Sequence, residues 1–519
     1  MDNTLRHQIG QMIIAGFPSL EVDDQARRLA EELQVGNFIL FARNMKTAQQ
    51  TADLCRELSD MTFAATGMAP FIAADQEGGL VSRIAEGASL FPGAMALAAG
   101  ATCEEARQVG KNCGQILRAM GVNVNFAPVL DVNIEPMNPV IGIRSFGDQP
   151  QAVADMGCAV MEGMVEGGVI ATVKHYPGHG NVKTDSHLAL PVNDTDPALL
   201  EQTEFLPFQQ AFDRGAPALM SCHIIFSKID PDLPATLSPT ILQGMLREKQ
   251  GFKGLVFTDG MEMDAIRAKW GTGRGAALAV KAGCDILCIS HHEDAVRDAI
   301  EEIVRAVESG EIPRSRIQEA YDRIVSYKKR MGLLERQDIS VEKAGALIHD
   351  EEKLALHKKV SRSSVTLLQG SVEVLRQAKN PLVICPVSFA ATGVEDKEHN
   401  GLSFAARAAA QLGGRFLEPA MTPSEEEIAA AVEQAKSADC VVLGLYNARF
   451  RESQIALLRA MEALDKPLIV VMVGGPCDLQ CIRRADAAVA LYEYTTLSVS
   501  SAIAALREGT FSGKAPMQF

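Results

Sequence analysis

The sequence lacks a surplus of positive charge. It contains 50 lysine and arginine residues against 65 aspartate and glutamate residues, which gives a formal net charge of -15. Proteins that bind nucleic acid draw much of their affinity from lysine and arginine side chains that displace counterions from the phosphates. Because no basic stripe is present here, the charge balance predicts that nucleic acid is not a partner.

The sequence also lacks long apolar runs. A membrane-spanning helix needs about 18 or more consecutive apolar residues, and no stretch reaches that length. The first residues, MDNTLRHQIGQMIIAGF, lack the basic start, apolar centre and small-residue cleavage site of a secretory signal. We therefore expect no membrane partner and a cytoplasmic location.

Paired cysteine motifs are missing as well. The chain has 11 cysteines, an odd number, and several lie inside apolar runs, as Cys284, Cys288 and Cys440 do. Such cysteines are typical of small buried residues in a reducing compartment and not of a disulfide framework. Cys477 and Cys481 do not form a CxxC pair, so we expect no zinc site and no cofactor.

With 519 residues, the chain is longer than a single hydrophobic core supports, so more than one domain is expected. Short runs rich in Val, Ile, Leu and Phe alternate with helical stretches, the pattern of parallel strands joined by crossover helices. Eight such runs within the first 335 residues predict an α/β fold that begins with a (β/α)8 TIM-type barrel. The predicted strands are 12–17, 37–42, 71–75, 122–128, 169–175, 218–224, 254–259 and 285–290.

A second α/β unit is predicted after the barrel. The charged segment 336–362 is interpreted as an exposed linker between residues 1–335 and residues 363–519. Apolar runs interleaved with alanine-rich helical stretches predict a layered αβα sandwich in the C-terminal part. Its predicted strands are 363–368, 381–387, 440–446, 467–475 and 487–492.

Polar residues cluster at the ends of the predicted barrel strands. Asp75, His175, His223 and Asp259 each lie at or just past the C-terminal end of an apolar run. Barrels of this kind build their active sites at that end of the strands. A single residue there could simply end its strand, but four together predict an active site.

The segment VKHYPGHGNVKTDSH, residues 173–187, is dense in chemically active side chains. His175 and His179 have the spacing of a helical metal pair, but the Pro-Gly between them makes a helix improbable. A phosphate-binding loop would need a Walker or GxGxxG pattern, which the segment does not contain. A purely structural loop remains open, and so does acid-base chemistry by Asp185 and His187, in which the carboxylate orients the imidazole.

Asp259 is the candidate nucleophile beside such an acid-base pair. It ends the apolar run GLVFTD, so its carboxylate is expected to project from the top of the barrel, although it could instead cap a helix. Asp75 lies in FIAADQEGG, which is either a turn or a place for a carboxylate that accepts two sugar hydroxyl groups.

The motif KHYPGHGNVKTDSH closely resembles the KHFPGHG…DSH signature of β-N-acetylhexosaminidases in glycoside hydrolase family 3. Further stretches resemble the same group in the same order across residues 10–335, among them GNFILFARN, AADQEGGLVSR, NFAPVLDVN, IGIRSFG and FTDGMEM. The resemblance implies that Asp259 is the nucleophile and that His187, oriented by Asp185, is the general acid/base. It further implies that the non-reducing-end sugar is bound by Asp75, Arg83, Arg144, Lys174 and His175.

For four other residues the resemblance leaves a supporting role open. His179 and His223 could contact substrate or support the loop and the barrel mouth, and Arg43 and Asn44 are interpreted as scaffold. Two departures from the common family pattern are Leu80, in place of an arginine, and Gly260, in place of a second aspartate. They leave the proposed catalytic residues intact and make an altered aglycone preference possible.

The resemblance predicts a retaining, exo-acting β-N-acetylglucosaminidase that acts on a small carbohydrate with a non-reducing terminal N-acetylglucosamine. Three alternatives stay open at this point. A phosphorylase would use phosphate as the acceptor, a plain glucosidase would act on another sugar, and a sugar-binding protein would have kept the barrel without catalysis.

Overall fold

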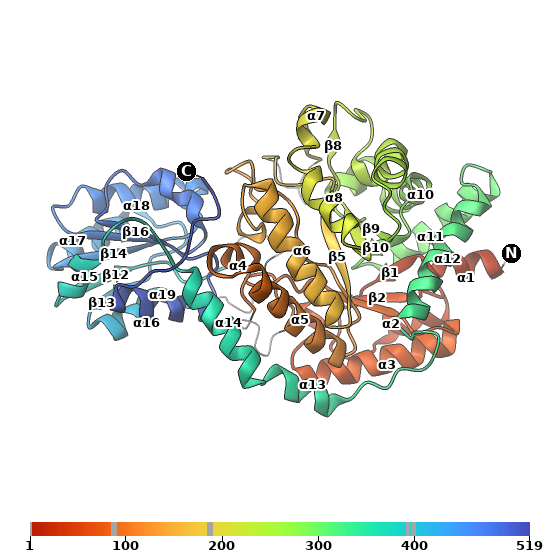
Figure 1. The fold of residues 1–519 in the computed structure, drawn as a ribbon, viewed down its shortest axis with the longest axis horizontal. Helices are drawn as coiled ribbons and strands as arrows, with labels where there is room; N and C mark the ends of the chain where they lie inside the picture. The colour runs from red at the N-terminus through yellow and green to blue at the C-terminus, as the bar shows by residue number, and fades with distance from the viewer. Residues whose placement is uncertain (1–2, 85–90, 184–189, 391–394, 396–400, 519) are drawn as a thin grey trace.

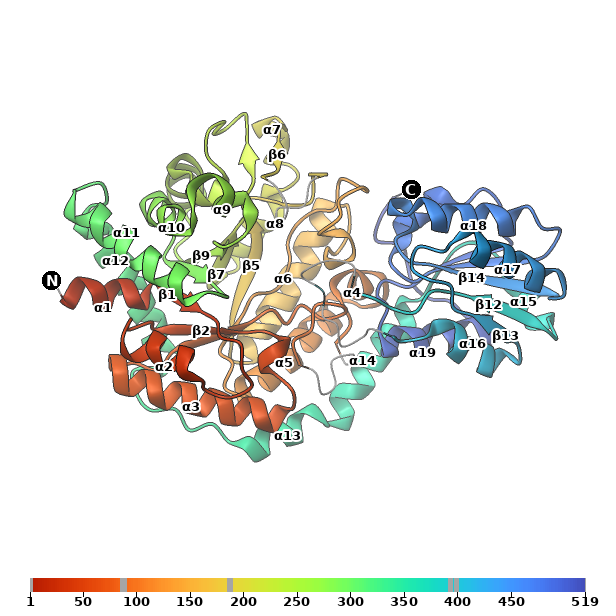
Figure 2. The same ribbon diagram turned by 180° about the vertical axis from the view of Figure 1, so that it is seen from behind.

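A computed structural model describes residues 3–84, 91–183, 190–390, 395 and 401–518. Two bodies lie side by side, a barrel formed by the N-terminal part and a layered sheet formed by the C-terminal part (Figures 1 and 2). The predicted fold class is confirmed by both.

The N-terminal body is a closed barrel in which every predicted strand is present, usually shorter than predicted. Its strands follow one another in the order β1-β10-β9-β7-β5-β4-β3-β2, and all neighbours are parallel. The strands are β1 (Ile13–Ala15), β2 (Asn37–Leu40), β3 (Phe71–Ala74), β4 (Val124–Asn125), β5 (Ile170–Tyr176), β7 (Ala218–Ser221), β9 (Leu255–Gly260) and β10 (Ile286–Ile289).

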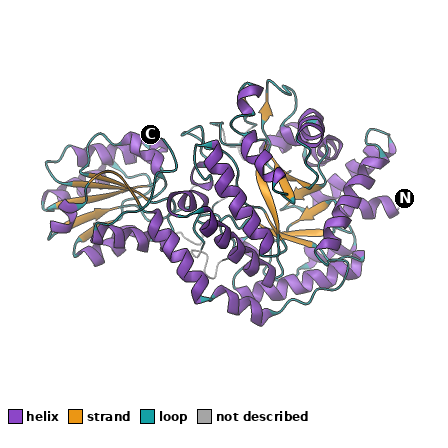
Figure 3. Cartoon of the chain, in the orientation of Figure 1, coloured by secondary structure: helices purple, strands orange, loops and turns teal. Residues whose placement is uncertain are grey.

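Helices surround the barrel and bury the outer face of its strands (Figure 3). Because both faces are covered, the strands are apolar along almost their whole length, as parallel strands usually are. The helices are α1 (Asn3–Gln11), α2 (Asp24–Glu31), α3 (Ala48–Thr66), α4 (Ala94–Gly100), α5 (Cys103–Ala119), α6 (Pro150–Glu166), α7 (Pro197–Leu200), α8 (Phe205–Asp213), α9 (Asp264–Trp270), α10 (Thr272–Ala282), α11 (Glu293–Glu308) and α12 (Arg314–Arg330).

Further elements lie in the connections. They are the single-turn helices η1 (Ala42–Asn44), η3 (Gly142–Arg144) and η4 (Ala235–Leu237), the ten-residue π-helix η5 (Thr240–Lys249), and the two-stranded pair β6 (Val192–Asn193) and β8 (Ile225–Phe226). Of these, η3 matters most for the site described below, because it carries Arg144.

Buried asparagines connect neighbouring segments at the N-terminal ends of the barrel strands. Asn37 donates to the carbonyl oxygens of Gln11 and Ile13 and accepts from the backbone N–H of Phe71. Asn123 likewise accepts from the N–H of Ile72 and donates to the carbonyl of Pro70. Since a buried backbone group without a partner is costly, these amides stabilise the barrel by satisfying backbone groups at and just before the strand starts.

The C-terminal body is a six-stranded sheet in the order β11-β16-β15-β14-β12-β13, parallel except for the antiparallel edge strand β11. The five predicted strands are found as β11 (Thr366–Gly370), β12 (Pro381–Ile384), β14 (Cys440–Leu445), β15 (Leu468–Met472) and β16 (Ala487–Ala490). The strand β13 (Arg415–Leu417) was not predicted, because this three-residue edge strand is only partly buried and so lacks an apolar run.

Alternate side chains of this sheet pack against helices on its two faces. Val383, Val442 and Val471 face α16 (Phe404–Leu412) and α19 (Thr496–Glu508). Leu382, Leu443 and Val470 pack in the opposite core with α17 (Glu425–Lys436) and α18 (Glu452–Glu462). The short helices α15 (Glu373–Gln377), η7 (Ala448–Phe450) and η8 (Pro476–Cys481) complete this body. The two-residue alternation of strand side chains therefore divides the domain into two cores.

The segment between the two bodies forms two helices, α13 (Val341–Ile348) and α14 (Glu351–Ser364). They run along the lower edge of the barrel and then to the sheet (Figure 1). Ala344 and Ile348 of α13 and Val360 of α14 belong to the barrel core, so this segment is packed and not merely an exposed connection.

Direct contacts also join the two bodies. The Glu493 carboxylate accepts from the backbone N–H of Gly93 at 2.7 Å, and Arg449 donates to the carbonyl of Pro136 at 3.0 Å. The C-terminal tail returns to the barrel, where the N–H of Lys514 donates to the carbonyl of Ala99. Among the described residues, no helix has both the length and the apolar character needed to cross a membrane.

One buried lysine makes the stability of the barrel depend on pH. Lys328 of α12 donates to Gln11 Oε1 at 2.7 Å and to the carbonyl of Gly36 at 2.9 Å, and burial lowers its pKa to about 7. An unfolded lysine has a pKa of about 10.4, so above pH 7 the unfolded chain holds more protons than the folded chain. The free energy of unfolding should therefore rise with pH through this window.

We expect the stability of the wild type, relative to a Lys328→Met variant, to increase by up to about 1.4 kcal/mol per pH unit between about pH 7 and pH 10. Urea unfolding at a series of pH values measures this difference. Lys329→Met is the matched control, because Lys329 is exposed on the same helix. A wild-type minus Lys328→Met difference that stays constant over this range would contradict the prediction.

Candidate active site

A cavity of about 590 Å³ opens at the C-terminal ends of the barrel strands. This volume is within the range of small-molecule sites. Six of the residues predicted from the sequence line it together: Asp75, Arg83, Arg144, Lys174, His175 and Asp259. Phe126, Met220, Met263 and Cys288 add apolar surface to the same cavity.

Four charged side chains form a continuous network at this cavity: Asp75, Arg144 and Lys174 line it, and Glu77 joins them without lining it. Asp75 directly follows β3, and its Oδ1 accepts from Lys174 Nζ at 2.7 Å. Lys174 Nζ also lies 2.7 Å from Glu77 Oε1. Arg144, from η3, binds Glu77 through two parallel hydrogen bonds of 2.9 Å and 2.8 Å. The two carboxylates and the two cations therefore fix one another from three separate segments of the chain.

The attraction between the charges of this buried network shifts the pKa values of Glu77 and Lys174. Burial by itself would raise the pKa of Glu77, but the charges of Arg144 and Lys174 outweigh it and hold that pKa far below its usual range. Burial likewise opposes the charge of Lys174, and the carboxylates of Asp75 and Glu77 more than offset this effect and raise the Lys174 pKa. Glu77 is thus an anion and Lys174 a cation at neutral pH.

A second buried carboxylate orients His175. Asp131 Oδ2 lies 2.6 Å from His175 Nδ1, while Asp131 Oδ1 accepts from the backbone N–H groups of His175 and His179. Burial disfavours the Asp131 anion, but the nearby His175 outweighs burial and lowers the Asp131 pKa. With Nδ1 directed at Asp131, the other ring nitrogen of His175 lies 3.5 Å from Arg144 Nη2.

Asp259 lies at the end of β9, on the cavity wall formed by β9 and β10. Its Oδ1 accepts from the backbone N–H of Gly260 at 2.8 Å. His223 is fully buried and contacts the carbonyl oxygen of Gly260 through Nε2 at 3.0 Å and Thr236 through Nδ1 at 2.9 Å. His223 therefore supports the backbone next to Asp259 and is not among the residues that line the cavity.

The remaining polar residues of the cavity have more varied surroundings. Arg83 Nη2 lies 3.7 Å from Asp75 Oδ2. Arg43 donates to the carbonyls of Phe17 and Ser290, and Asn44 donates to those of Phe17 and Ser19, so both tie loops of the barrel mouth together. Burial, followed by the charge of His175, lowers the pKa of His179 to about 4, which leaves its ring neutral at pH 7.

The predicted acid/base pair, Asp185 and His187, lies outside the described residues. The part of the same segment that precedes it is held against the barrel. Asn138 Nδ2 donates to the carbonyl of His179, and the N–H of Glu135 donates to the carbonyl of Gly180. A Cβ at Gly180 would collide with the carbonyl oxygen of Val132, so this close approach requires glycine.

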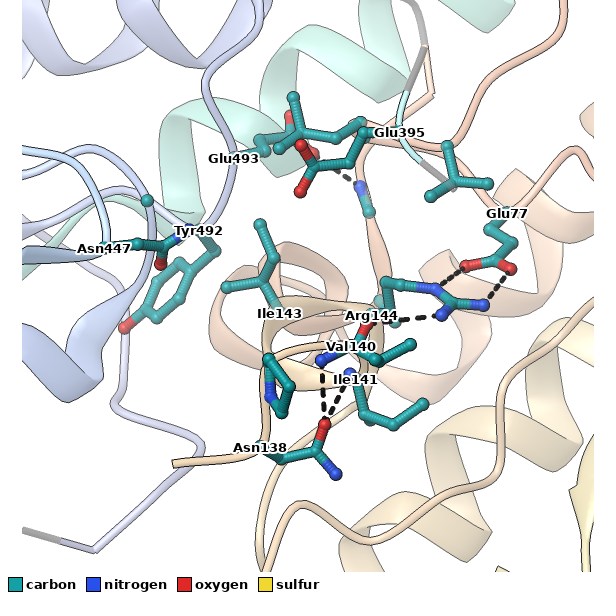
Figure 4. Close-up of a pocket in the computed structure, with 18 of the residues that line it drawn as sticks. Glu77, Asn138, Val140, Ile141, Ile143, Arg144, Glu395, Asn447, Tyr492 and Glu493 are labelled. Carbon is teal, nitrogen blue, oxygen red and sulfur yellow. Dashed lines mark hydrogen bonds and ion pairs between the residues drawn. The ribbon is translucent and has the colours of Figure 1, made fainter. Parts of the chain in front are cut away.

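The second body contributes to the surroundings of the site. Glu395, from the C-terminal part of the chain, lines the same cavity as Asp259. A neighbouring cavity of about 560 Å³ lies between the two bodies and shares Arg144, Val140 and Glu395 with the first. Figure 4 shows this space, with Arg144 bound to Glu77 on the barrel side and Tyr492 and Asn447 on the other.

Three residues with clear contacts in or beside the site were not predicted as site residues. Glu77 lies in FIAADQEGG, for which a turn and a sugar-binding carboxylate were both left open, and its charge two residues after Asp75 is the signal that could have marked it. Asp131 lies in the stretch NFAPVLDVN, six residues after β4, and so was not found by looking directly at strand ends. No local signal marks Glu395, because it reaches the cavity from the other body.

Comparisons with known proteins find similar sequences over the barrel. A family model described as glycosyl hydrolase family 3 N terminal domain matches residues 4–327. A β-hexosaminidase of Thioalkalivibrio sulfidiphilus is 38% identical over 287 residues, 53% of this chain and 80% of that protein. One from Thiobacillus denitrificans is 37% identical over 278 residues, 52% of this chain and 76% of that protein.

Solved structures resemble the whole chain. The family 3 β-N-acetylglucosaminidase from Paenibacillus sp. str. FPU-7 superposes with a TM-score of 0.92 and 34% identity, covering 99% of this chain and 98% of that chain. A β-glucoside phosphorylase superposes with a TM-score of 0.82 at 20% identity, covering 100% of this chain and 95% of that chain, a likeness of fold alone.

The buried network predicts a large stability cost for neutralising Glu77. A Glu77→Gln variant would leave Arg144 and Lys174 with one carboxylate fewer, and breaking a buried ion pair typically costs about 3–5 kcal/mol. Urea unfolding should show a loss of at least about 3 kcal/mol for this variant. Glu311→Gln is the control, because Glu311 also pairs with two cations, Arg274 and Lys281, but nearer the surface, where about 1 kcal/mol is expected. An equal loss of unfolding free energy in both variants would contradict the prediction that burial makes the Glu77 ion pairs more important for stability.

Proposed function

Because the chain belongs to glycoside hydrolase family 3 and is therefore a glycoside hydrolase, we propose that it is a retaining, exo-acting β-N-acetylglucosaminidase. Its substrate in this proposal is a small carbohydrate with a non-reducing terminal β-linked N-acetylglucosamine. The observation that carries the proposal is the position of Asp259 at the end of β9, in the same cavity as the Asp75, Lys174 and Arg144 side chains. The similarity to proteins named β-hexosaminidase supports the choice of sugar.

The proposed reaction is a double displacement. Asp259 attacks the anomeric carbon while His187 gives a proton to the leaving oxygen, which yields a covalent glycosyl-enzyme and the free aglycone. His187 then removes a proton from water, whose oxygen attacks the same carbon and releases Asp259. Asp185 orients the imidazole and stabilises its charged form in both steps. His187 thus plays the part that a second carboxyl group plays in most glycosidases.

The charged wall of the cavity suits a sugar ring. Carboxylates accept hydrogen bonds from neighbouring hydroxyl groups, and ammonium and guanidinium groups donate them. Lys174 Nζ has three N–H donors, of which two are directed at Asp75 and Glu77. In the proposal the third donates to a sugar hydroxyl, which Asp75, Arg83, Arg144 and His175 help to bind. The mutual contacts of these residues position them before substrate arrives, which reduces the entropic cost of binding.

The leaving group is proposed to extend into the cavity between the two bodies, because that cavity adjoins the sugar site at Arg144, Val140 and Glu395. In this arrangement residues 1–335 form the catalytic domain, residues 336–362 the linker and residues 363–519 the second domain. The catalytic domain would hold the sugar, and the second domain would contact the aglycone.

The first prediction of this proposal concerns the sugar and the nucleophile. Among nitrophenyl glycosides of GlcNAc, GlcN, Glc and GalNAc, we expect the wild type to release nitrophenol fastest from the GlcNAc substrate. Asp259→Ala should lower kcat/KM by at least about 10,000-fold, because removing a nucleophile abolishes covalent catalysis. Residual activity within tenfold of the wild type would rule out Asp259 as the nucleophile. If sugar phosphate forms when phosphate is added, the reaction is phosphorolysis and not hydrolysis.

The second prediction concerns His187. A nitrophenolate is a good leaving group that needs little protonation, so a His187→Ala variant should still form the glycosyl-enzyme. Its hydrolysis should then slow by about 100- to 10,000-fold, since the general base is missing. Rapid-mixing kinetics should show a burst of nitrophenol followed by slow turnover. Lys228→Ala is the control, because Lys228 is exposed and lines neither the cavity at the barrel mouth nor the cavity between the two bodies. Unchanged steady-state release in His187→Ala would refute the assignment.

A further inference from the structure

A large cavity lies at the end of the barrel opposite to the candidate active site. Its volume is about 650 Å³. Pro70 and Ile72, at the start of β3, and Asn123, just before β4, form its floor at the N-terminal ends of the strands. Its outer wall is the segment 337–343, which leads from the barrel into α13. In Figure 1 this helix runs along the lower edge of the barrel beside α3.

Arg118, at the end of α5, is the principal charge in this cavity. Its Nη2 donates to the carbonyl of Met331 and to Gln337 Oε1, both at 3.4 Å, whereas an ordinary N–H···O bond is about 2.9 Å long. Burial lowers the pKa of Arg118, and no acidic side chain among the described residues offsets that effect. The guanidinium is therefore partly buried with only weak, neutral acceptors.

The other charges on the cavity wall are mostly positive. Lys343 and Lys353 line the cavity with Arg118, and Asp338 is the single acidic residue among the described residues that do so. Lys353 is paired with Asp350 at 2.9 Å. The remaining charges on the cavity wall are then the two cations Arg118 and Lys343 and the one anion Asp338. A positive cavity is unexpected in a chain with a net charge of -15.

Lys343 and Gln115 add hydrogen-bond donors to the wall. Both line the cavity, and Lys343 is exposed on the eight-residue helix α13. Other polar groups nearby already have partners: the backbone N–H of Lys343 donates to Ser340 Oγ, and the Gln337 amide donates to two backbone carbonyls. The planar fork of Arg118 and the ammonium group of Lys343 are therefore the groups that match the acceptor oxygens of a phosphate.

From these observations we propose that the cavity is a binding site for a small polar molecule that carries a phosphate group. The phosphate would contact Arg118 and Lys343, and the polar body would occupy the rest of the space toward Gln115 and Asn123. Because the outer wall belongs to the segment between the two bodies, the ligand would hold this segment against the barrel. The site is separate from the sugar cavity, so this proposal stands independently of the proposed function.

Calorimetric titration with inorganic phosphate, and separately with glycerol 3-phosphate, tests the proposal at constant ionic strength in chloride. We expect saturable binding to the wild type. Arg118→Gln should weaken it by more than about tenfold, since a hydrogen bond to a charged group contributes about 1.5–3 kcal/mol. Hydrogen exchange of residues 337–343 should slow when phosphate binds.

Two further variants distinguish the site from other causes. Ala119→Leu narrows the cavity without changing its charge, and it should abolish glycerol 3-phosphate binding even if Arg118→Gln fails to fold. Arg336→Gln is the matched control, because Arg336 is exposed beside the cavity but does not line it, and it should bind as the wild type does. Phosphate binding that survives in both Arg118→Gln and Ala119→Leu would overturn the proposal, as would tighter binding of succinate than of either phosphate.

Discussion

The Glu77 carboxylate accepts hydrogen bonds from Arg144 while it also pairs with Lys174, and its side chain is only 6% exposed. Buried charges are stable only when each has its partners, because the penalty of removing an ion from water must be offset locally. Lys174 extends this constraint to Asp75, and Arg144 extends it to His175. One network therefore holds the charged wall of the cavity, and its members come from the loop after β3, from η3 and from β5.

The second body completes a site that the barrel begins. Glu395 lines the cavity at the barrel mouth, Glu493 accepts from the backbone N–H of Gly93, and Arg449 donates to the backbone carbonyl of Pro136. These contacts fix the space beyond Arg144, where an aglycone would lie. The two adjoining cavities share Arg144, Val140 and Glu395, which fits the proposed division into a sugar site and an aglycone site. The positive cavity beside α13 lies at the opposite end of the barrel and is separate from this site.

Much of the fold follows from the order of apolar and polar residues. The eight barrel strands and the four inner sheet strands are largely apolar because both of their faces are buried, so each leaves a continuous signal in the sequence. The partly exposed edge strand β11 was predicted only in part, and the edge strand β13 leaves no such signal. Asp75, His175 and Asp259 could be found because parallel strands bring their C-terminal ends to one face, whichever strands are neighbours.

The sequence by itself determined the barrel, the layered sheet and the polar residues at strand ends, because burial patterns and strand ends are local properties. Only the tertiary structure decided that Glu77 joins Arg144 and Lys174, that Asp131 orients His175, and that Glu395 reaches the same cavity. Such pairs are far apart in the chain and depend on the paths of loops. Their Coulomb and hydrogen-bond energies arise only after packing has excluded water, and no periodicity in the sequence records them.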